Sequence, residues 1–538
     1  MLNNGNGYKN KGLTPRIMPL RRCLIGLIII TNTAVAELND ITQAPNTVNA
    51  GIKKSLTEQI GMGRGDINTP DSSIYLINRD PFRAIVRGRQ LFQRKFQIKQ
   101  GFGPRVNDGE GDLNTNGALG AGLADSCAAC HARPRGGAGD GGDVFTRPDS
   151  RDAPHLFGLG LIEMLADEIT ADLRAVRDSA IETAQSTNSN KTVYLKSKGI
   201  QYGSITAHPD GSVDNSHLKG IDDDLRVKPF FAEGSDFSIR SFSMGAFNAE
   251  MGLQSHDPDH QLAFAGNNVI TPSGLSLAGN KDAVSMPPVS DSFADGDSDG
   301  ISNEMPPELL DYMEFYLLNY FKPAQYKSNR ATRKGKYLME KIGCTTCHKT
   351  DLVINKDRRV ADVETAYDRE NGGFNHLYAT AEAKFDEIDD GSGYPALKQP
   401  KLNSFIVKNV YADFKRHDLG SKFWERNFDG SYQKEFMTEP LWGVGTTAPY
   451  GHDGRSINLH EVILRHGGEA ASSRKKYAYL WGASQRAIVS YLQSLVLFPP
   501  PDTASNLDPG DKSDPMYPQE SQGSISLTPL FNDPTDLE

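Results

Sequence analysis

The chain lacks a long hydrophobic run, an excess of basic residues and more than a handful of cysteines. The apolar run Leu24–Ile30 is too short for a membrane anchor, which needs about 20 residues. The formal net charge is −10, and it becomes −15 without residues 1–36, which hold five basic and no acidic side chains. Such an acidic surface argues against nucleic acid as a partner and is compatible with basic redox partners.

Two Cys-x-x-Cys-His motifs contain four of the five cysteines. They are Cys127-Ala128-Ala129-Cys130-His131 and Cys344-Thr345-Thr346-Cys347-His348. This pentapeptide is typical of c-type haem attachment: the two thiols bind the porphyrin as thioethers, and the adjacent histidine is the proximal ligand of the iron. We therefore expect two covalently bound haem c groups, with His131 and His348 on the two irons.

Two other functions of Cys-x-x-Cys fit these motifs less well. A zinc site would place its two cysteine pairs about 12–20 residues apart, whereas these motifs are more than two hundred residues apart. A thioredoxin-like redox pair does not need the histidine that follows both motifs here. Haem attachment explains the repeated histidine, and it predicts a redox protein.

The N-terminal segment is typical of a secretory signal peptide. Arg21 and Arg22 precede the apolar run, and Ala34-Val35-Ala36 offers a cleavage site of small residues. We expect residues 1–36 to be removed, with Met18 as an alternative start, so that Cys23 leaves with the signal and no stable membrane span remains. Because c-type haem is attached outside the bacterial inner membrane, the expected location is the periplasm.

The positions of the motifs divide the chain into two expected haem domains. We predict a mainly α fold with two cytochrome c-like haem domains, long loops and few short strands. The predicted parts are an N-terminal haem domain with insertions over 45–322, a C-terminal cytochrome c-like domain over 325–500 and a disordered tail over 501–538, which is rich in Asp, Ser and Pro. The predicted helices are Pro81–Phe96, Leu159–Val176, Ser241–Leu253, Pro306–Tyr320, Arg333–Gly343 and Gln485–Leu497.

Several stretches resemble the dihaem oxidoreductases that are related to bacterial dihaem cytochrome c peroxidases. The resemblance covers roughly residues 80–497, and its C-terminal run is more specific than the haem motifs. The matching stretches are Gly88–Phe92, Asp125–His131, Leu156–Glu163, Asn248–Gly252, Pro440–Gly445, His452–Arg455 and His466–Ala470.

The resemblance implies an axial ligand for the second haem. In the dihaem peroxidases a Pro-Tyr-x-His-(Asp/Ser)-Gly segment precedes the distal ligand, typically Met, by fourteen residues counted from its histidine. Here His452 belongs to that segment and His466 stands at the ligand position. The resemblance therefore implies a haem ligated by His348 and His466, with His452 near the haem and Arg455 as a propionate partner. The alternative is that His466 is a surface histidine at a helix end.

The resemblance also suggests a catalytic carboxylate, Glu250. It lies in the apolar stretch Phe247–Leu253, where a carboxylate is costly unless it is paired or functional. The peroxidases place a glutamate in the distal pocket of the first haem, so Glu250 is the candidate acid/base. The alternative is a structural carboxylate paired with an arginine such as Arg240. His155 is a further candidate for a displaceable ligand of the first haem, and a packing role is the alternative.

An acidic loop before the predicted Pro306–Tyr320 helix follows a calcium-loop pattern. Carboxylates alternate before a turn glycine, and oxygen ligands of this kind suit a hard cation. The position that completes an EF-hand is a proline, so the loop is not a standard EF-hand, and a solvated acidic loop is the alternative. The candidate Ca²⁺ ligands are Asp295, Asp297, Asp299, Ile301 and Glu304.

The function implied by the resemblance is peroxidase-like. An electron-donor protein, such as a small cytochrome or a cupredoxin, would reduce the C-terminal haem. Electrons would pass to the N-terminal haem, where a small oxidant such as hydrogen peroxide is reduced with help from Glu250. The alternatives are a pure electron-transfer dihaem cytochrome, a dihaem oxygenase and a protein-modifying oxidase, the last opposed by His466 at a position where those enzymes carry Tyr.

Overall fold

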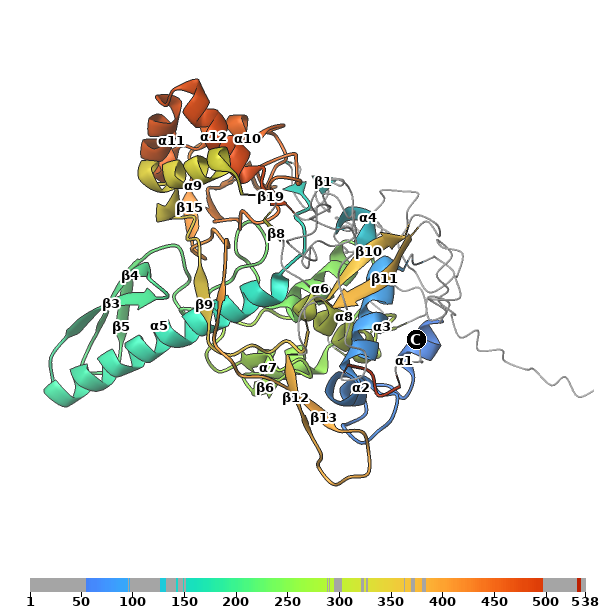
Figure 1. Ribbon diagram of the computed structural model, residues 1–538. Helices are drawn as coiled ribbons and strands as arrows, with labels where there is room; N and C mark the ends of the chain where they lie inside the picture. Colours follow the sequence, from blue (N-terminus) through green and yellow to red (C-terminus); the bar gives the residue numbers. More distant parts are fainter. Residues whose placement is uncertain are drawn as a thin grey trace, which may run out of the picture. The chain divides into compact units, whose positions relative to one another are not determined.

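The computed structural model (Figure 1) describes the greater part of the unit Glu37–Glu538. The described residues are 55–94, 96, 126–131, 142–143, 149, 151–287, 289, 291–294, 302–320, 324–325, 328–361, 363–368, 373–379, 384–496 and 530–533. The predicted signal peptide lies outside these residues, as do most of the acidic loop and most of the C-terminal tail. The boundaries of the two haem domains therefore stay predictions.

Helix α8 (Pro307–Asn319) is at the centre of the larger core. Each of its residues from Glu308 to Asn319 is buried, and an apolar helix buried on every side is a core element. Helix α3 (Pro81–Gln93) packs against it at Gly88, where an added Cβ would lie 2.2 Å from the backbone oxygen of Tyr312. The helices that share this region are α1 (Leu56–Ile60), α2 (Ser73–Arg79), α5 (Leu159–Thr187) and α6 (Ile239–Ala249). Helix α7 (Pro258–Phe264) joins it through the ion pair of Asp259 with Arg64.

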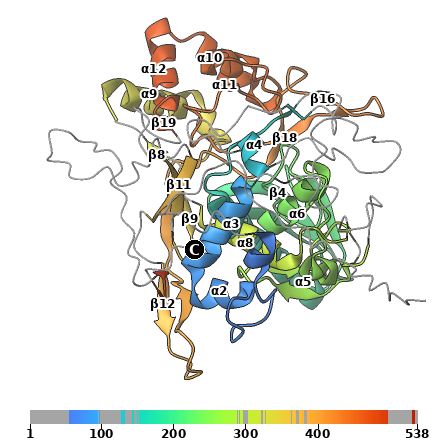
Figure 2. The same cartoon turned by 90° about the vertical axis from the view of Figure 1, so that its right-hand side faces the viewer.

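A second, smaller core lies between α9 (Arg330–Ile342) and α12 (Gly482–Leu492). The two helices approach closely at Gly335, where a Cβ would meet the backbone oxygen of Ala487 at 2.0 Å. Helices α10 (Leu459–Arg465) and α11 (Ala471–Ala478) complete this group, which both views show together (Figures 1 and 2). Helix α9 leads directly into the second haem motif, and the cytochrome c-like character of this part stays a prediction.

The strands form nine small antiparallel sheets within the described residues. One has three strands, β3 (Lys191–Ser197), β4 (Ile200–Ala207) and β5 (Val213–Leu218). The two-stranded sheets pair β1 (Gly142–Asp143) with β2 (Arg151–Asp152), β6 (Asn268–Ile270) with β7 (Ser276–Ala278), β8 (Ala324–Gln325) with β19 (Leu495–Val496), β9 (Leu352–Ile354) with β14 (Phe405–Val407), β10 (Val363–Asp368) with β11 (Gly373–Ala379), β12 (Phe385–Ile388) with β13 (Leu397–Pro400), β15 (Arg416–Asp418) with β18 (Glu435–Met437), and β16 (Glu425–Arg426) with β17 (Tyr432–Gln433).

The prediction of a mainly α fold is wrong. Helix makes up 37% of the structure and strand 17%, and the strands are spread over several small sheets. Hairpins fill two long intervals, one after α5 and one between α9 and α10. Most strands of the second interval are two to four residues long, too short for the alternation of apolar and polar residues to stand out in the sequence.

The predicted helices are all present, with shifted ends. Helix α5 extends to Thr187, eleven residues beyond the expected end. Its last turns are mostly polar, so the apolar pattern does not mark them, but Ala180 and Ala184 pack against the hairpin sheet. The other five begin or end within a few residues of the predicted positions. Periodicity therefore located the helices, and neighbouring elements determined where they stop.

Part of the C-terminal tail is ordered. Leu530 and Phe531 are buried in the larger core, and the Phe531 ring lies 4.5 Å from that of Phe82 between centroids. Asn532 donates to the backbone oxygen of Arg79. The prediction of a disordered tail is therefore wrong for residues 530–533. Among the described helices, none combines the length and the apolar character needed to cross a membrane.

Candidate functional site

The first haem motif forms the short helix α4 (Cys127–His131). One helical turn brings Cys127 and Cys130 to the same side, next to His131. The Nδ1 atom of His131 lies 2.7 Å from the backbone oxygen of Pro154. Because a carbonyl oxygen can only accept, Nδ1 carries the proton and Nε2 keeps its lone pair. Burial lowers the pKa of His131, which keeps the ring neutral.

The second haem motif repeats this arrangement. Helix α9 ends at Ile342 and is capped by Gly343, whose φ of 93° is left-handed, and the chain then turns through the short 3-10 helix Cys344–Thr346. The Nδ1 atom of His348 lies 2.9 Å from the backbone oxygen of Tyr411. Burial lowers the pKa of His348 as well. His348 is therefore neutral, with Nε2 available to a metal.

These residues fit two haem c groups. A metal-binding histidine commonly donates its other ring N–H to a backbone carbonyl, which fixes the tautomer and the ring orientation. Both motif histidines do so. The four motif cysteines are half-buried and form no disulfide, as thioether bonds to a porphyrin require. Covalent attachment itself stays a prediction.

His466 lies close to His348. It caps the end of α10, and its Nδ1 donates to the backbone oxygen of Val462 at 2.7 Å, which leaves Nε2 free of hydrogen bonds among the described residues. Burial lowers its pKa to about 4, and the nearby His348 adds to this effect. A neutral, half-buried histidine beside His348 does not match a surface residue. The geometry supports a His348–His466 ligand pair, which stays a prediction.

His155 lies near His131, but both of its ring nitrogens have protein partners. Nε2 is 3.0 Å from the backbone oxygen of Trp442, and Nδ1 accepts from the N–H of Phe157 at 3.2 Å. Burial lowers its pKa to about 4, with a smaller contribution from His131. While both hydrogen bonds persist, His155 cannot bind an iron. The structure favours its packing role over the ligand role.

Glu250 follows the last residue of α6 and is half-buried. Its neighbour Met251 places Sδ 3.9 Å from Cys127 Sγ, so this end of α6 lies at the first haem motif. The alternative partner, Arg240, makes its hydrogen bonds with three other carboxylates, Asp257, Asp311 and Glu314. These contacts favour Glu250 as a residue of the first haem site, and its catalytic role stays a prediction.

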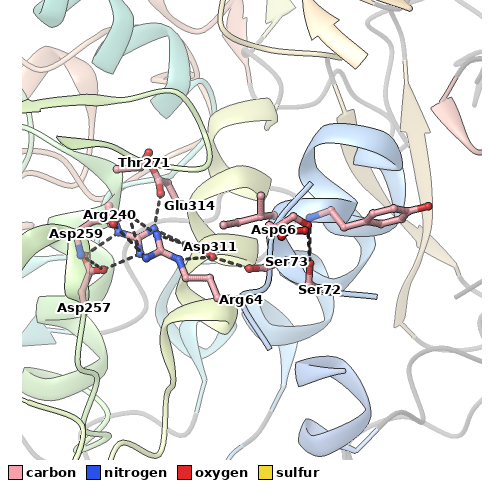
Figure 3. A network of polar contacts seen from close by, with 12 residues as sticks. Arg64, Asp66, Ser72, Ser73, Arg240, Asp257, Asp259, Thr271, Asp311 and Glu314 are labelled. Atoms are coloured by element: carbon pink, nitrogen blue, oxygen red, sulfur yellow. Dashed lines mark hydrogen bonds and ion pairs between the residues drawn. The ribbon is translucent and has the colours of Figure 1, made fainter. Parts of the chain in front are cut away.

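A buried network of charges fixes the other end of α6 (Figure 3). Two arginines from distant parts of the chain join carboxylates of α8, of α7 and of Asp257, the residue that caps α7. Burial opposes the charge of Arg240, but its carboxylate partners hold its pKa well above the ordinary value. Sequence reasoning missed this network, although two acids within the apolar sequence of α8 were a signal for it. The members are Arg64, Arg240, Asp257, Asp259, Asp311, Glu314, Ser73 and Thr271.

The ring of His452 stacks on Phe436, with centroids 3.9 Å apart. Burial lowers its pKa to about 4. Arg455 is about half exposed and pairs with Asp149 at 3.4 Å and Asp453 at 3.6 Å. The positions of His452 and Arg455 around a haem stay predictions, and in this structure carboxylates of the chain bind Arg455.

Sequence reasoning also missed His417, which lies beside the second motif. Its Nε2 is 3.0 Å from Asp413 and its Nδ1 is 2.9 Å from Glu469. Burial opposes protonation, but these carboxylates and Cys347 raise its pKa to about 11. The ligand atoms of Cys347, Asp413 and His417 lie within 4.8 Å of one another and could hold a metal ion. Such an ion would compete with haem attachment for Cys347.

The predicted calcium site is largely outside the described residues. Asp295, Asp297, Asp299 and Ile301 all lie there. Glu304 is buried and accepts a hydrogen bond from the backbone N–H of Gln254 at 2.8 Å. The Ca²⁺ site stays a prediction.

The surroundings of the two motifs are joined by one segment, residues 442–466. Trp442 binds His155 near the first motif, and the backbone oxygen of His452 accepts from the N–H of Asp152 at 2.8 Å. At the other end of the segment, His466 lies beside His348. Residues 384–495, which include this segment, match the family described as "Di-haem oxidoreductase, putative peroxidase". This part of the chain is similar to the di-haem oxidoreductases.

The family match confirms the resemblance inferred from the sequence and supports haem as the cofactor. A search of the curated proteins found no match. Among solved structures, the chain is similar to hydrazine synthase of Kuenenia stuttgartiensis, pressurised with 20 bar xenon, at 17% identity and a TM-score of 0.19. That match covers 37% of this chain and 59% of the other, which is less than two thirds of the other chain's length.

Proposed function

We propose that this protein is a periplasmic dihaem c-type cytochrome that reduces a small oxidant such as hydrogen peroxide. The observation that carries the proposal is the inequality of the two motif histidines. His348 has His466 beside it with a free Nε2, as an electron-transfer site with two histidine ligands requires. The histidine near His131 is His155, and both of its nitrogens are bound by the chain.

Bound at these motifs, the haem groups would supply one-electron redox chemistry, with electrons entering at the C-terminal site and the oxidant reduced at the N-terminal site. Reduction of one peroxide to two waters consumes two electrons and two protons, so a group that delivers protons is needed. Glu250 fits this task, because α6 places it beside the first motif. Its carboxyl group would hold and release a proton there.

The order of the chain supports the proposed electron path. Residues 442–466 contact the surroundings of both motifs, so one continuous segment spans the distance between the two sites. The electron donor would be a small cytochrome or cupredoxin of the periplasm. Ca²⁺ in the acidic loop before α8 would be structural.

A pure electron carrier is the second candidate function. The observation that favours it is the position of His155 close to His131. If the bonds to Trp442 and Phe157 broke, His155 Nε2 could become a second ligand, and both irons would then be closed to an oxidant. A dihaem oxygenase would also need a free coordination position at the N-terminal haem, but it would act on a different substrate.

Spectroscopy and turnover of the exported protein test the proposal. The protein, matured in a host that attaches c-type haem, should carry two covalent haems by mass spectrometry. After partial reduction, one haem should bind cyanide, and the reduced protein should consume peroxide. Two low-spin haems that remain inert to cyanide and peroxide would establish the electron carrier instead. A protein without covalent haem would contradict both functions.

A further inference from the structure

The helices around the second motif carry a concentration of positive charge. On α9 the exposed cations include Arg333, Lys334 and Lys341, and on α11 they include Lys475 and Lys476. The only acid on these helices and α12 is Glu340. The whole chain, by contrast, has a formal net charge of −10. The sign of the charge on this face is therefore opposite to that of the protein.

These cations are not neutralised by the described part of the chain. None of the ion pairs found among the described residues involves a basic residue of α9, α11 or α12. Lys341 lies over the ring of Tyr337, 5.9 Å from its centroid. The positive charge is thus available to a partner.

Large aromatic side chains lie among these charges. Trp481 is 86% exposed, Tyr479 is 78% exposed and Tyr337 is 59% exposed. Trp, Tyr and Arg are the residues that most often contribute strongly to the energy of protein interfaces. Exposed aromatic rings with surrounding cations therefore have the composition of a docking surface.

The face borders the second haem motif. A Cβ at Gly343, the residue before Cys344, would lie 3.1 Å from Ser473 Oγ of α11. Lys476 is close enough to Cys344 to oppose the rise that burial causes in the pKa of this thiol. Figures 1 and 2 show α9, α11 and α12 grouped together. A protein bound here would contact the part of the chain that holds the second haem.

We propose that this basic face, formed by α9, α11 and the exposed Tyr479 and Trp481, docks an acidic electron-donor protein. The proposal rests on the proposed function, in which electrons enter at the second haem. At physiological ionic strength charges are screened beyond about 8 Å, so a close partner responds to the local face rather than to the net charge. The electron donor is therefore acidic on its docking side, although the net charge of the chain would favour a basic one.

Charge reversal on this face tests the proposal. The variant is Arg333→Glu/Lys334→Glu/Lys475→Glu, and its matched control is Lys191→Glu/Lys196→Glu/Lys219→Glu. The control changes the net charge equally, at exposed lysines on and beside the three-stranded β3–β5 sheet. The probe is a small acidic cytochrome in its reduced form, and stopped-flow absorbance follows its oxidation as the second haem is reduced.

We expect the wild-type rate to fall as salt is added, because attraction across the interface is screened. The face variant should lose about tenfold or more of the low-salt rate, while the control stays within about twofold of wild type. Trp481→Ala should slow the reaction several-fold without changing its salt dependence. Equal rates in the face variant and the control would overturn the docking proposal.

A small reductant separates this outcome from failure of the proposed function. Ascorbate with a redox mediator needs no docking surface, so it should reduce the second haem equally in all variants. If ascorbate reduces all variants at the same rate, and the acidic cytochrome also reduces the face variant and the control at the same rate, the docking proposal is wrong and the proposed redox function stands. If the purified protein carries no reducible haem, both proposals are wrong.

Discussion

His155 donates a hydrogen bond from Nε2 to the backbone oxygen of Trp442, 3.0 Å away. The bond joins the neighbourhood of the first haem motif to the segment that matches the di-haem oxidoreductases. It also occupies the ring nitrogen that an iron would need. The first site therefore differs from the second, where His466 retains a free Nε2.

The first prediction concerns His155. Replacement by Gln, which can still hydrogen-bond, should leave the haem absorption and EPR spectra unchanged, because the ring is not a ligand in this arrangement. Cyanide affinity of the partially reduced protein should stay within about threefold of wild type. The appearance of a new high-spin haem in this variant would show that His155 is an iron ligand.

The second prediction concerns His466. Replacement by Met should convert a bis-histidine spectrum into a His/Met spectrum and raise the reduction potential of that haem, because thioether ligation favours the reduced iron. We expect a rise on the order of 0.1 V, within the about 0.8 V that axial ligands span. Spectroelectrochemistry measures both effects.

A matched control for His466 is His217→Met, at an exposed position of β5. It should have the wild-type spectrum and potential. If His466→Met behaves in the same way as this control, His466 is not the ligand.

The third prediction concerns Glu250. Glu250→Gln keeps the size of the side chain but removes the carboxylate that would transfer protons. Peroxide turnover should fall by about 10²–10⁴-fold, while haem content and the unfolding midpoint stay unchanged. Glu182→Gln, on the exposed side of α5, should have no effect. A loss of stability that parallels the loss of turnover would instead assign Glu250 a structural role.

The fourth prediction concerns the buried network in Figure 3. Arg240→Ala should lower the free energy of unfolding by about 3–5 kcal/mol, because it leaves buried carboxylates without their cation. The partly exposed pair of Arg177 and Asp178 is the comparison, and Arg177→Ala should cost about 0–1 kcal/mol. Chemical denaturation measures both values. Equal costs would mean that the network does not stabilise the fold.

The fifth prediction concerns pH and His417. The folded protein holds this histidine protonated up to a pKa of about 11, whereas the unfolded chain releases the proton near pH 6.5. The stabilisation from His417 is therefore complete below about pH 6.5 and is lost as the pH rises toward 11. Between these values the stability advantage of wild type over His417→Gln should shrink steadily with pH.

Denaturation at pH 6 and pH 10 checks this dependence. The difference between wild type and His417→Gln removes the contribution of other groups that titrate in the same range. His217→Gln, at the exposed β5 position, should follow the wild-type pH profile. An advantage that is constant from pH 6 to pH 10 would contradict the raised pKa.

Much of the helical framework could be predicted from the sequence. The periodic apolar residues of α3, α8 and α9 identified these helices because each buries one side or all of its surface in a core. The short hairpin strands could not be predicted, because pairs of two to four residues leave no repeating pattern. Their pairing depends on which segments the helices bring together.

The sequence by itself determined that two haem motifs exist and which histidine belongs to each, because attachment chemistry requires adjacent residues. It could not determine what surrounds those histidines. Pro154 and Tyr411 orient the two rings, and Asp413 with Glu469 keeps His417 charged, through contacts between segments far apart in the chain. Only the tertiary structure decided these partners, since burial and hydrogen bonding arise when distant segments pack together.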